Sequence, residues 1–363
     1  MEEFEPIDIK ASKKKKRGKS NTGLVVLLIV MSFVVLSSLV VAAMSLKLYY
    51  DSKEVKEDPA IVDVQTEKTY TQSEVDAMLE EAKIEEDAIA LARFKKDLKE
   101  SAESSSGLLN TLRAMYPEYI VTYYGNKYNF IEIDPDLAPA NFINENIIAN
   151  NGFMEYREDG AVKSVKGIDV SKFQGDIDWV KVKESGVDYV MIRLGIRGYE
   201  TGKLALDENF DKNIQGATDA GIDVGVYFFT QAINEAEARE EAQFVIDAIA
   251  PYNITYPVVI DVEDLYNDNA RSAGQSMESR TSCAKAFMDA IAAAGYKPAI
   301  YGNLATFSRL VNINELGDYD KWYAYYESNI YFPYKISMWQ YSDKGSIDGI
   351  EGDVDLNIAF PAE

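Results

Sequence analysis

This 363-residue chain contains no histidine and only one cysteine. The lack of histidine excludes a Ser-His-Asp triad, a Cys-His dyad and every zinc or iron site that needs an imidazole ligand. The lone Cys283 cannot form an intramolecular disulfide, and no histidine exists to activate it, so we interpret it as a small buried residue of a helix. Any catalysis must therefore use carboxylates, phenols or amides.

Positive charge is also scarce: 37 basic residues face 60 acidic ones, which gives a formal net charge of -23. Residues 1–23 carry a small positive excess, so the remainder is more acidic still. A chain region with so much negative charge repels nucleic acid and anionic lipid. We therefore expect no nucleic-acid partner, and a neutral or zwitterionic substrate that is held by shape and hydrogen bonds.

The long hydrophobic run at residues 24–46 is interrupted only by serines and is long enough to span a membrane as a helix. Six basic residues between Lys13 and Lys19 precede it, so the positive-inside rule predicts that residues 1–23 form a cytoplasmic tail. We expect a single-pass plasma-membrane protein with its catalytic part outside the cell. A cleaved signal peptide is the alternative, although its apolar core is usually about 7 to 15 residues long.

Residues 47–107 are predicted to form a linker and an amphipathic stalk helix. Thr71 and Glu74 fit a capping box, and apolar residues then recur at helical spacing. The heptad register breaks at Glu85, which favours a single helix over a coiled coil and leaves dimerisation open. Residues 108–163 contain the alternating stretches YIVTYYG and YNFIEI, which predict a few strands of a small accessory segment.

Residues 164–363 repeat a strand-then-helix pattern. Strand-like segments alternate with helical runs five times: GIDVS, VDYVMIRLG, DVGVYFF, PVVIDVE and KPAIYG. Three more strand-like segments follow too closely for full helices between them: KWYAYY, KISMWQY and GDVDLN. The predicted fold class is α/β, an irregular (β/α) barrel with about eight strands and five helices.

Alternation along these strands predicts which side chains enter the barrel. If the aliphatic residues pack against the helices, the residues between them point inward. This rule selects polar residues that all lie near the C-terminal ends of their strands, where barrel enzymes place their sites: Asp169, Arg193, Tyr227, Asp261, Glu263, Tyr301, Gln340 and Asp355. A single acid at such a position often caps a helix or pairs with an arginine. Four converging acids would repel one another, which favours a functional role.

The D-V-E pair is the most informative of these features. Asp261 and Glu263 share one strand face, which places their carboxyl groups roughly 5 to 7 Å apart. This separation suits glycoside hydrolysis, in which one acid protonates the leaving oxygen and a second negative group stabilises the oxocarbenium-like centre. A spacing of about 5 Å between the two carboxyl groups indicates retention of configuration.

Crowding by Asp261, Asp169 and Asp355 is expected to raise the pKa of Glu263, so that Glu263 acts as the general acid. The other inward residues are assigned to substrate binding: Tyr227, Tyr301, Arg193 and Gln340.

Residues 166 to 360 resemble a known family, the glycoside hydrolase family 25 lysozymes or Chalaropsis-type muramidases. The motifs appear in the family's order and spacing, and they are specific as a set: GIDVSKFQGDIDW, YVMIRLG, GVYFFTQA, PVVIDVED, AIYGN, WYAYY, SMWQYS and GIEGDVDLN.

The resemblance implies hydrolysis of the β-1,4 bond between N-acetylmuramic acid and N-acetylglucosamine in peptidoglycan, with no metal and no organic cofactor. By motif, Glu263 resembles the family's general acid. Asp261 resembles the residue that stabilises the intermediate or positions the acetamido group, and Asp169 and Asp355 match the other two acids of the site. Phe228 departs from the family, since many members have histidine there.

We therefore expect a membrane-tethered muramidase in cell-wall remodelling, with peptidoglycan glycan strands and the plasma membrane as its partners. Two alternatives remain open. One is a catalytically silent wall-binding scaffold, and the other is a hydrolase of another N-acetylated glycan such as chitin.

Overall fold

A computed structural model describes residues 69–104, 107–265, 267 and 269–360. The predicted basic tail, the predicted membrane span and most of the linker lie outside the described residues. Within that described part, no helix combines the length and apolar character needed to cross a membrane. The chain divides into two compact units, Met1–Glu85 and Glu86–Glu363.

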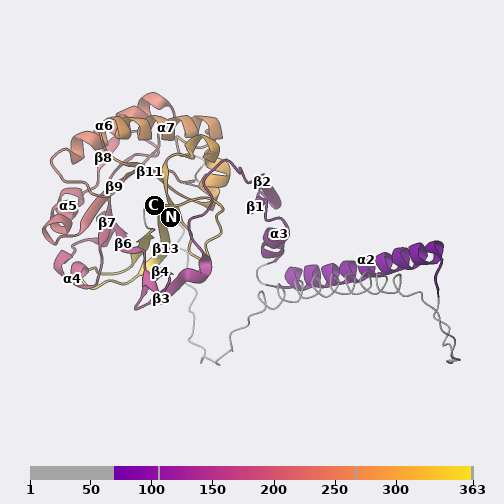
Figure 1. Cartoon of the computed structure of the whole chain (residues 1–363). Helices are drawn as coiled ribbons and strands as arrows, with labels where there is room; N and C mark the ends of the chain where they lie inside the picture. The colour runs from indigo at the N-terminus through magenta and orange to yellow at the C-terminus, as the bar shows by residue number, and fades with distance from the viewer. Residues whose placement is uncertain (1–68, 105–106, 266, 268, 361–363) are drawn as a thin grey trace, which may run out of the picture. The chain divides into compact units, whose positions relative to one another are not determined.

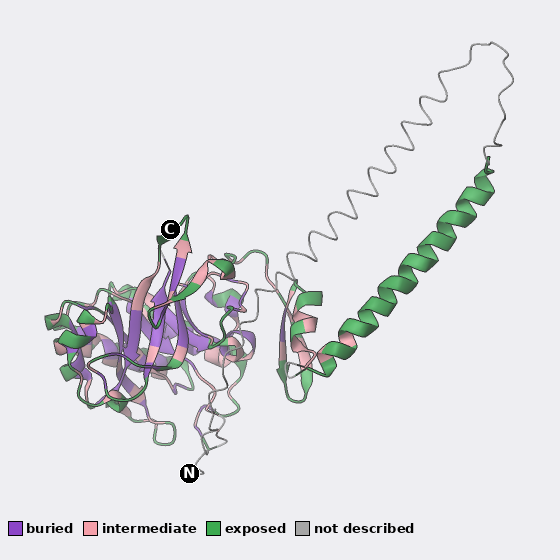
Figure 2. Ribbon diagram, turned by 90° about the horizontal axis from the view of Figure 1, so that it is seen from below, coloured by how far each residue is buried: buried purple, intermediate pink, exposed green. Residues whose placement is uncertain are grey.

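Helix α2 (Gln72–Ala102) begins at the predicted capping box. The Thr71 backbone N–H donates to Glu74 Oε2 at 2.7 Å, and the Glu74 N–H donates to Thr71 Oγ1 at 3.3 Å. These bonds satisfy amide groups that the first helical turn leaves unpaired. None of the helix's described residues is buried, so apolar side chains such as Leu79 and Ile89 are exposed (Figure 2). The predicted helix is present, and its role as a stalk stays a prediction.

Residues 108–163, where the sequence predicts a few strands, contain two small sheets. After α3 (Leu109–Met115), β1 (Tyr119–Tyr124) and β2 (Lys127–Glu132) pair as an antiparallel hairpin. Its turn residues Gly125 and Asn126 have φ angles of 62° and 58°, as a tight two-residue hairpin turn requires. The 3-10 turn η1 (Asn144–Asn146) then leads to a three-stranded sheet: β3 (Ile147–Asn150), β4 (Phe153–Glu158) and β5 (Ala161–Val162).

The remaining described residues form an eight-stranded closed barrel (Figure 1). Seven strands are parallel, and β14 is antiparallel to its neighbours β13 and β6. Strand β6 also pairs with β7, which closes the barrel, and the short β8 (Leu204–Leu206) pairs with the end of β7. The barrel strands are β6 (Val165–Val170), β7 (Tyr189–Arg197), β9 (Asp223–Phe229), β10 (Val258–Asp261), β11 (Pro298–Asn303), β12 (Asp320–Ala324), β13 (Met338–Gly345) and β14 (Val354–Ala359).

Four α-helices cover the described barrel, one fewer than the sequence predicted: α4 (Trp179–Glu184), α5 (Phe210–Asp219), α6 (Glu235–Ile249) and α7 (Met277–Ala293). Where the fifth was expected, between β11 and β12, the chain forms a π-helical turn η3 (Thr306–Leu310) and a 3-10 turn η4 (Ile313–Leu316). Asn312 separates them, because its side chain accepts a hydrogen bond from Asn314 N and caps the second turn. A further 3-10 turn, η2 (Lys172–Gln174), follows β6.

The hydrophobic core has two parts, and the alternation of side chains explains both. On β10, Val258 and Ile260 belong to the larger cluster that the helices cover, whereas Val259 belongs to the smaller one. The smaller cluster also contains Met191, Trp322 and other alternate residues of the barrel strands. The inward and outward faces predicted from the sequence are therefore confirmed for these strands.

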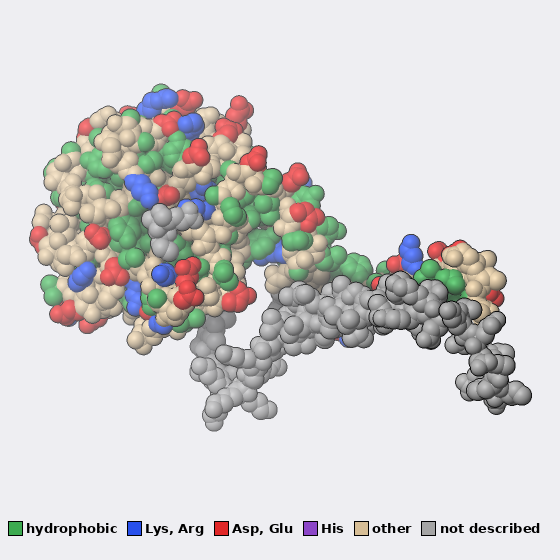
Figure 3. Space-filling view, in the orientation of Figure 1, with side chains coloured by type: hydrophobic (Ala, Val, Ile, Leu, Met, Phe, Trp, Pro, Cys, Tyr) green, Lys and Arg blue, Asp and Glu red, His purple; other side chains and the backbone are tan. Residues whose placement is uncertain are grey.

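Surface charges of both signs are mixed on the face shown in Figure 3. Asp and Glu side chains lie among Lys and Arg side chains there, without one large patch of a single sign. That face therefore offers no concentrated field to attract a polyanion.

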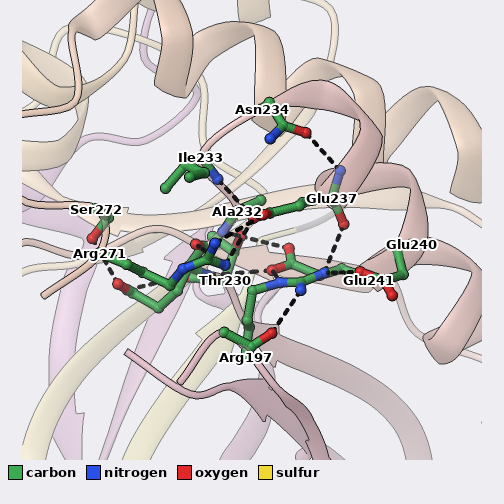
Figure 4. A network of polar contacts seen from close by, with 12 residues as sticks. Arg197, Thr230, Ala232, Ile233, Asn234, Glu237, Glu240, Glu241, Arg271 and Ser272 are labelled. Atoms are coloured by element: carbon green, nitrogen blue, oxygen red, sulfur yellow. Dashed lines mark hydrogen bonds and ion pairs between the residues drawn. The ribbon is translucent and has the colours of Figure 1, made fainter. Parts of the chain in front are cut away.

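A buried ion-pair network joins strand β7 to helix α6 (Figure 4). Arg197, at the end of β7, donates from Nε to Glu241 at 2.7 Å and from Nη2 to Glu240 at 2.7 Å. The Arg197 and Glu241 side chains are 4% and 0% exposed. Glu241 also accepts a bond from the Thr230 hydroxyl at 2.6 Å, which ties the loop after β9 to the same carboxylate. Each buried charge therefore depends on its partner for compensation.

We predict that Arg197→Met destabilises the barrel by about 3 to 5 kcal/mol, because Glu241 would keep a buried charge without its partner. Chemical denaturation followed by tryptophan fluorescence measures this loss.

The control is Lys285→Met, which breaks the exposed pair between Lys285 and Asp289 on α7. It should cost no more than about 1 kcal/mol. Equal small losses in both variants would show that the Arg197 network does not stabilise the fold.

Candidate active site

A cavity of about 300 Å³ lies at the mouth of the barrel. All eight residues that the sequence analysis selected line it. Three further aromatic residues, Phe229, Trp322 and Tyr326, complete its wall. The structure therefore brings the selected side chains together in one place, while the roles assigned to them stay predictions.

The prediction that all eight residues lie near the C-terminal ends of their strands is wrong in part. Gln340 is the third of the eight residues of β13, and Asp355 is the second residue of β14. Since β14 runs antiparallel to β6, its beginning reaches the same mouth as the C-terminal ends of the parallel strands, and Asp355 pairs directly with Asp169 across the sheet. The antiparallel direction was not visible in the spacing of the segments. Phe228 lies on the other side of β9, buried against Phe287 of α7.

Asp169 is held by two side-chain amides. Its Oδ1 accepts hydrogen bonds from Gln340 Nε2 at 2.8 Å and from Asn357 Nδ2 at 2.7 Å. Trp322 Nε1 in turn donates to Asn357 Oδ1 at 2.8 Å, which orients that amide. Donors of this kind favour the ionised carboxylate.

The Gln340 amide is oriented by two phenols. Tyr301 and Tyr326 donate to Gln340 Oε1 at 2.8 Å and 2.9 Å. Burial raises the pKa of the Tyr301 hydroxyl well above its usual value, so this hydroxyl stays protonated as a donor. A chain of hydrogen bonds thus runs from the phenols through Gln340 to Asp169, and such chains strengthen each bond in them.

Arg193 lines the cavity and pairs with Asp207. Its Nε and Nη2 lie 2.7 Å and 2.6 Å from Asp207 Oδ2. Its positive charge opposes the rise in the pKa of Asp261. Arg193 therefore acts on the nearby acids as well as presenting a surface to a ligand.

Asp261 and Glu263 project from the end of β10. The backbone between them is fixed, because Val262 N donates to Tyr301 O at 3.1 Å and Thr306 Oγ1 donates to Val262 O at 2.9 Å. Asp261 is 5% exposed, and its Oδ1 has no hydrogen-bond partner among the described residues. A buried acceptor in this state is available to an N–H or O–H group of a ligand.

The pKa values of all four acids are raised. Burial is the main cause for Asp169 and Asp261, and repulsion from neighbouring carboxylates adds to it. Burial, with the charge of Asp343, raises the pKa of Asp355 to about 6. For Glu263 the cause is burial, whereas the sequence analysis attributed the rise to crowding.

Within the described part of the chain, no group of His, Cys or acidic residues could hold a metal ion.

Four further residues of the site were not predicted from the sequence, although they alternate along the strands in the same way as the predicted residues. Phe229 follows Tyr227 at i+2, and Asn357 follows Asp355 at i+2. Trp322 and Tyr326 are alternate residues of the segment KWYAYY. The alternation rule would have found them, because it applies to aromatic and amide side chains as well as to acids.

We predict that Asp261→Asn stabilises the protein at neutral pH by about 0.5 to 2 kcal/mol, the usual gain when a functional site is relaxed. The raised pKa of Asp261 means that ionisation opposes folding above the unfolded-state pKa of about 3.9. The advantage of asparagine should therefore grow as pH rises above about 4 and vanish below it. Thermal unfolding midpoints measured across this range test it.

Asp348→Asn removes an exposed acid and should change these midpoints little at any pH. A pH-independent effect of Asp261→Asn would contradict the assigned burial cost.

Comparison with known proteins identifies the barrel. The family model described as glycosyl hydrolases family 25 matches residues 168–350. The chain is 30% identical over 196 residues to an autolytic lysozyme of Clostridium acetobutylicum, covering 53% of this chain and 55% of that protein. It is 28% identical over 205 residues to lysozyme M1 of Streptomyces globisporus, covering 53% and 67%. The match thus spans little more than half the length of the clostridial relative.

A solved structure agrees with this fold. The modular autolysin LytC from Streptococcus pneumoniae, in complex with a synthetic peptidoglycan ligand, matches with a TM-score of 0.50 and 22% identity over 67% of each chain. At this identity the likeness supports the fold alone. The family model covers half of the chain and includes six of the eight barrel strands in full and part of β6, so the chain belongs to glycosyl hydrolases family 25.

Proposed function

We propose that this protein is a peptidoglycan hydrolase that cleaves the β-1,4 bond between N-acetylmuramic acid and N-acetylglucosamine. The observation that carries the proposal is the convergence of Glu263, Asp261, Asp169 and Asp355 in one cavity at the barrel mouth. The family and the relatives named as lysozymes support the same activity.

In the proposed mechanism Glu263 donates its proton to the oxygen of the cleaved bond. Burial keeps that proton on the carboxyl group, because it raises the pKa of Glu263. The proton passes to the leaving sugar, and Glu263 then accepts a proton from the incoming water as a general base.

Asp261 stabilises the opposite side of the reacting carbon. Its free Oδ1 is suited either to hold the positive charge that develops there or to accept the N–H of the substrate's acetamido group. Asp169, fixed by two amide donors, adds a further carboxyl group to the same site. The amide and phenol chain keeps Asp169 in place during the reaction.

Replacing the acid tests the mechanism. Glu263→Gln in the full-length protein should lower turnover on purified peptidoglycan by about 10² to 10⁴-fold, the usual contribution of a general acid. Mass spectrometry of the released fragments measures turnover and identifies the reducing ends. For the wild type we expect muramic-acid reducing ends.

The matched control is Glu208→Gln, an exposed glutamate, which should leave turnover unchanged. Activity of the wild type should fall as pH rises through the raised pKa of Glu263, and this falling part of the pH profile should be lost in Glu263→Gln.

Release of chito-oligosaccharides from chitin, without muramic-acid ends from walls, would favour the alternative glycan substrate. A wild type that binds walls and never cleaves them would favour the silent scaffold.

We further propose that the protein is tethered to the plasma membrane, with its N-terminus in the cytoplasm and its barrel outside. Support comes from the apolar run 24–46 and the basic residues before it, which lie outside the described residues. Val34→Arg/Val35→Arg should reduce insertion, because each central arginine costs roughly 2.5 to 3.5 kcal/mol.

Alkaline extraction of membranes measures this effect, since an integral protein stays with the membrane. Complete extraction of the wild type, or a shorter mature chain that begins after residue 46, would contradict the tether.

A further inference from the structure

A second cavity, of about 550 Å³, adjoins the acid-lined one. The two share Glu263, Tyr301 and Tyr326 in their walls. Its volume lies within the range of about 300 to 1,000 Å³ that is usual for small-ligand sites. Because Glu263 lines both, a chain of sugars bound at the acids would continue directly into this second space.

The outer wall of the second cavity comes from outside the region matched by the family model. Arg113 of α3 and Thr122, Tyr123 and Tyr124 of β1 line it, whereas the family match begins at residue 168. The accessory hairpin therefore completes a space that the barrel alone leaves open on this side.

Specific contacts fix this wall to the barrel. Val121 N donates to the hydroxyl of Tyr331 at 2.8 Å, and the Arg113 guanidinium lies 3.8 Å from the centre of the Tyr331 ring. Arg113 Nε also donates to Val121 O at 3.1 Å, so one side chain joins α3, β1 and the loop after β12. A wall held in this way is formed before a ligand arrives, which lowers the entropy cost of binding.

Two charged side chains in the cavity, Arg309 and Asp264, form an ion pair. Arg309 lies with its guanidinium carbon 3.9 Å from the centre of the Tyr124 ring, and its Nη1 is 3.1 Å from Asp264 Oδ2. Asp264 directly follows the proposed acid Glu263 in the chain. The ion pair compensates these two charges, and the surface beside it offers aromatic faces and hydroxyl groups.

Three of these rings are unusually accessible. Tyr123, Tyr124 and Tyr326 are 56%, 52% and 52% exposed, although they line a concave surface. Tyrosine presents a large apolar face and a hydroxyl group at a small cost in conformational entropy. This combination suits a sugar ring, which has an apolar face and polar edges.

We propose that the β1–β2 hairpin and α3 form an additional glycan-binding subsite, which holds N-acetylated sugar rings next to the bond that is cleaved. This proposal rests on the proposed function and adds a specificity element from residues 108–132. The subsite should make the protein prefer long glycan strands over short fragments, because only a long strand fills both cavities.

The first test compares substrates. Tyr123→Ala/Tyr124→Ala in the full-length protein should raise KM for long glycan strands without peptide stems by about tenfold, as expected for lost aromatic contacts. The effect on a tetrasaccharide should be much smaller. Tyr123→Phe/Tyr124→Phe keeps the ring faces and should restore KM to within about twofold of the wild type.

Tyr199→Ala removes an exposed tyrosine that lines neither cavity, and it should leave both KM values unchanged. Thermal unfolding of each variant shows whether the fold is kept. An unchanged KM for long strands in a folded Tyr123→Ala/Tyr124→Ala variant would overturn the subsite. An effect seen only on strands that carry peptide stems would also overturn it, because the wall would then recognise peptide.

A binding measurement separates this proposal from the proposed function. In the Glu263→Gln background, titration calorimetry with stem-free glycan strands should show about tenfold weaker binding when the two tyrosines are replaced by alanine. Equal affinity would refute the subsite even if the wild type is an active hydrolase. If the tyrosine replacements weaken binding but the wild type shows no hydrolase activity, the subsite is supported and the proposed function is refuted.

Discussion

The candidate active site depends on the burial of several carboxyl groups at one end of the barrel. Removing charge from water is costly, and the cost rises when like charges are close. The molecule offsets part of it at Asp169, where two amides donate to one oxygen. Asp261 receives no such bond on its Oδ1. The amide donors lower the pKa of Asp169, but burial outweighs them, so the pKa values of Asp169 and Asp261 are both raised well above the usual value for a carboxyl group.

Neighbouring strands of the same barrel supply the groups that restrain the acids. Gln340 and Asn357 lie on β13 and β14, and Trp322 on β12 orients Asn357. The outer faces of the strands pack against the helices, as Ile260 and Val258 do on β10. The hydrophobic packing outside the barrel thus fixes the geometry of the polar groups inside it.

Much of this arrangement could be predicted because strand alternation is a local rule. It selected eight residues that the structure brings to one cavity. It could not reveal that β14 runs antiparallel, since direction depends on contacts between distant strands. The π-helical turn in place of a fifth helix was missed because the short connection carries no clear period. Strands were expected in residues 108–163, but the position of the β1–β2 hairpin beside Glu263 depends on contacts such as Val121 with Tyr331, more than 200 residues apart.

Closure of the barrel by β6 and β14 has a consequence for how the protein matures. Asp169 and Asp355 face each other across that seam, and Asn357 reaches Asp169 from the same strand. The first and last barrel strands must meet before these groups are assembled, and such distant pairings form late because the intervening loop is costly to close. Under the proposed function, hydrolase activity would therefore appear only after the last strand has docked.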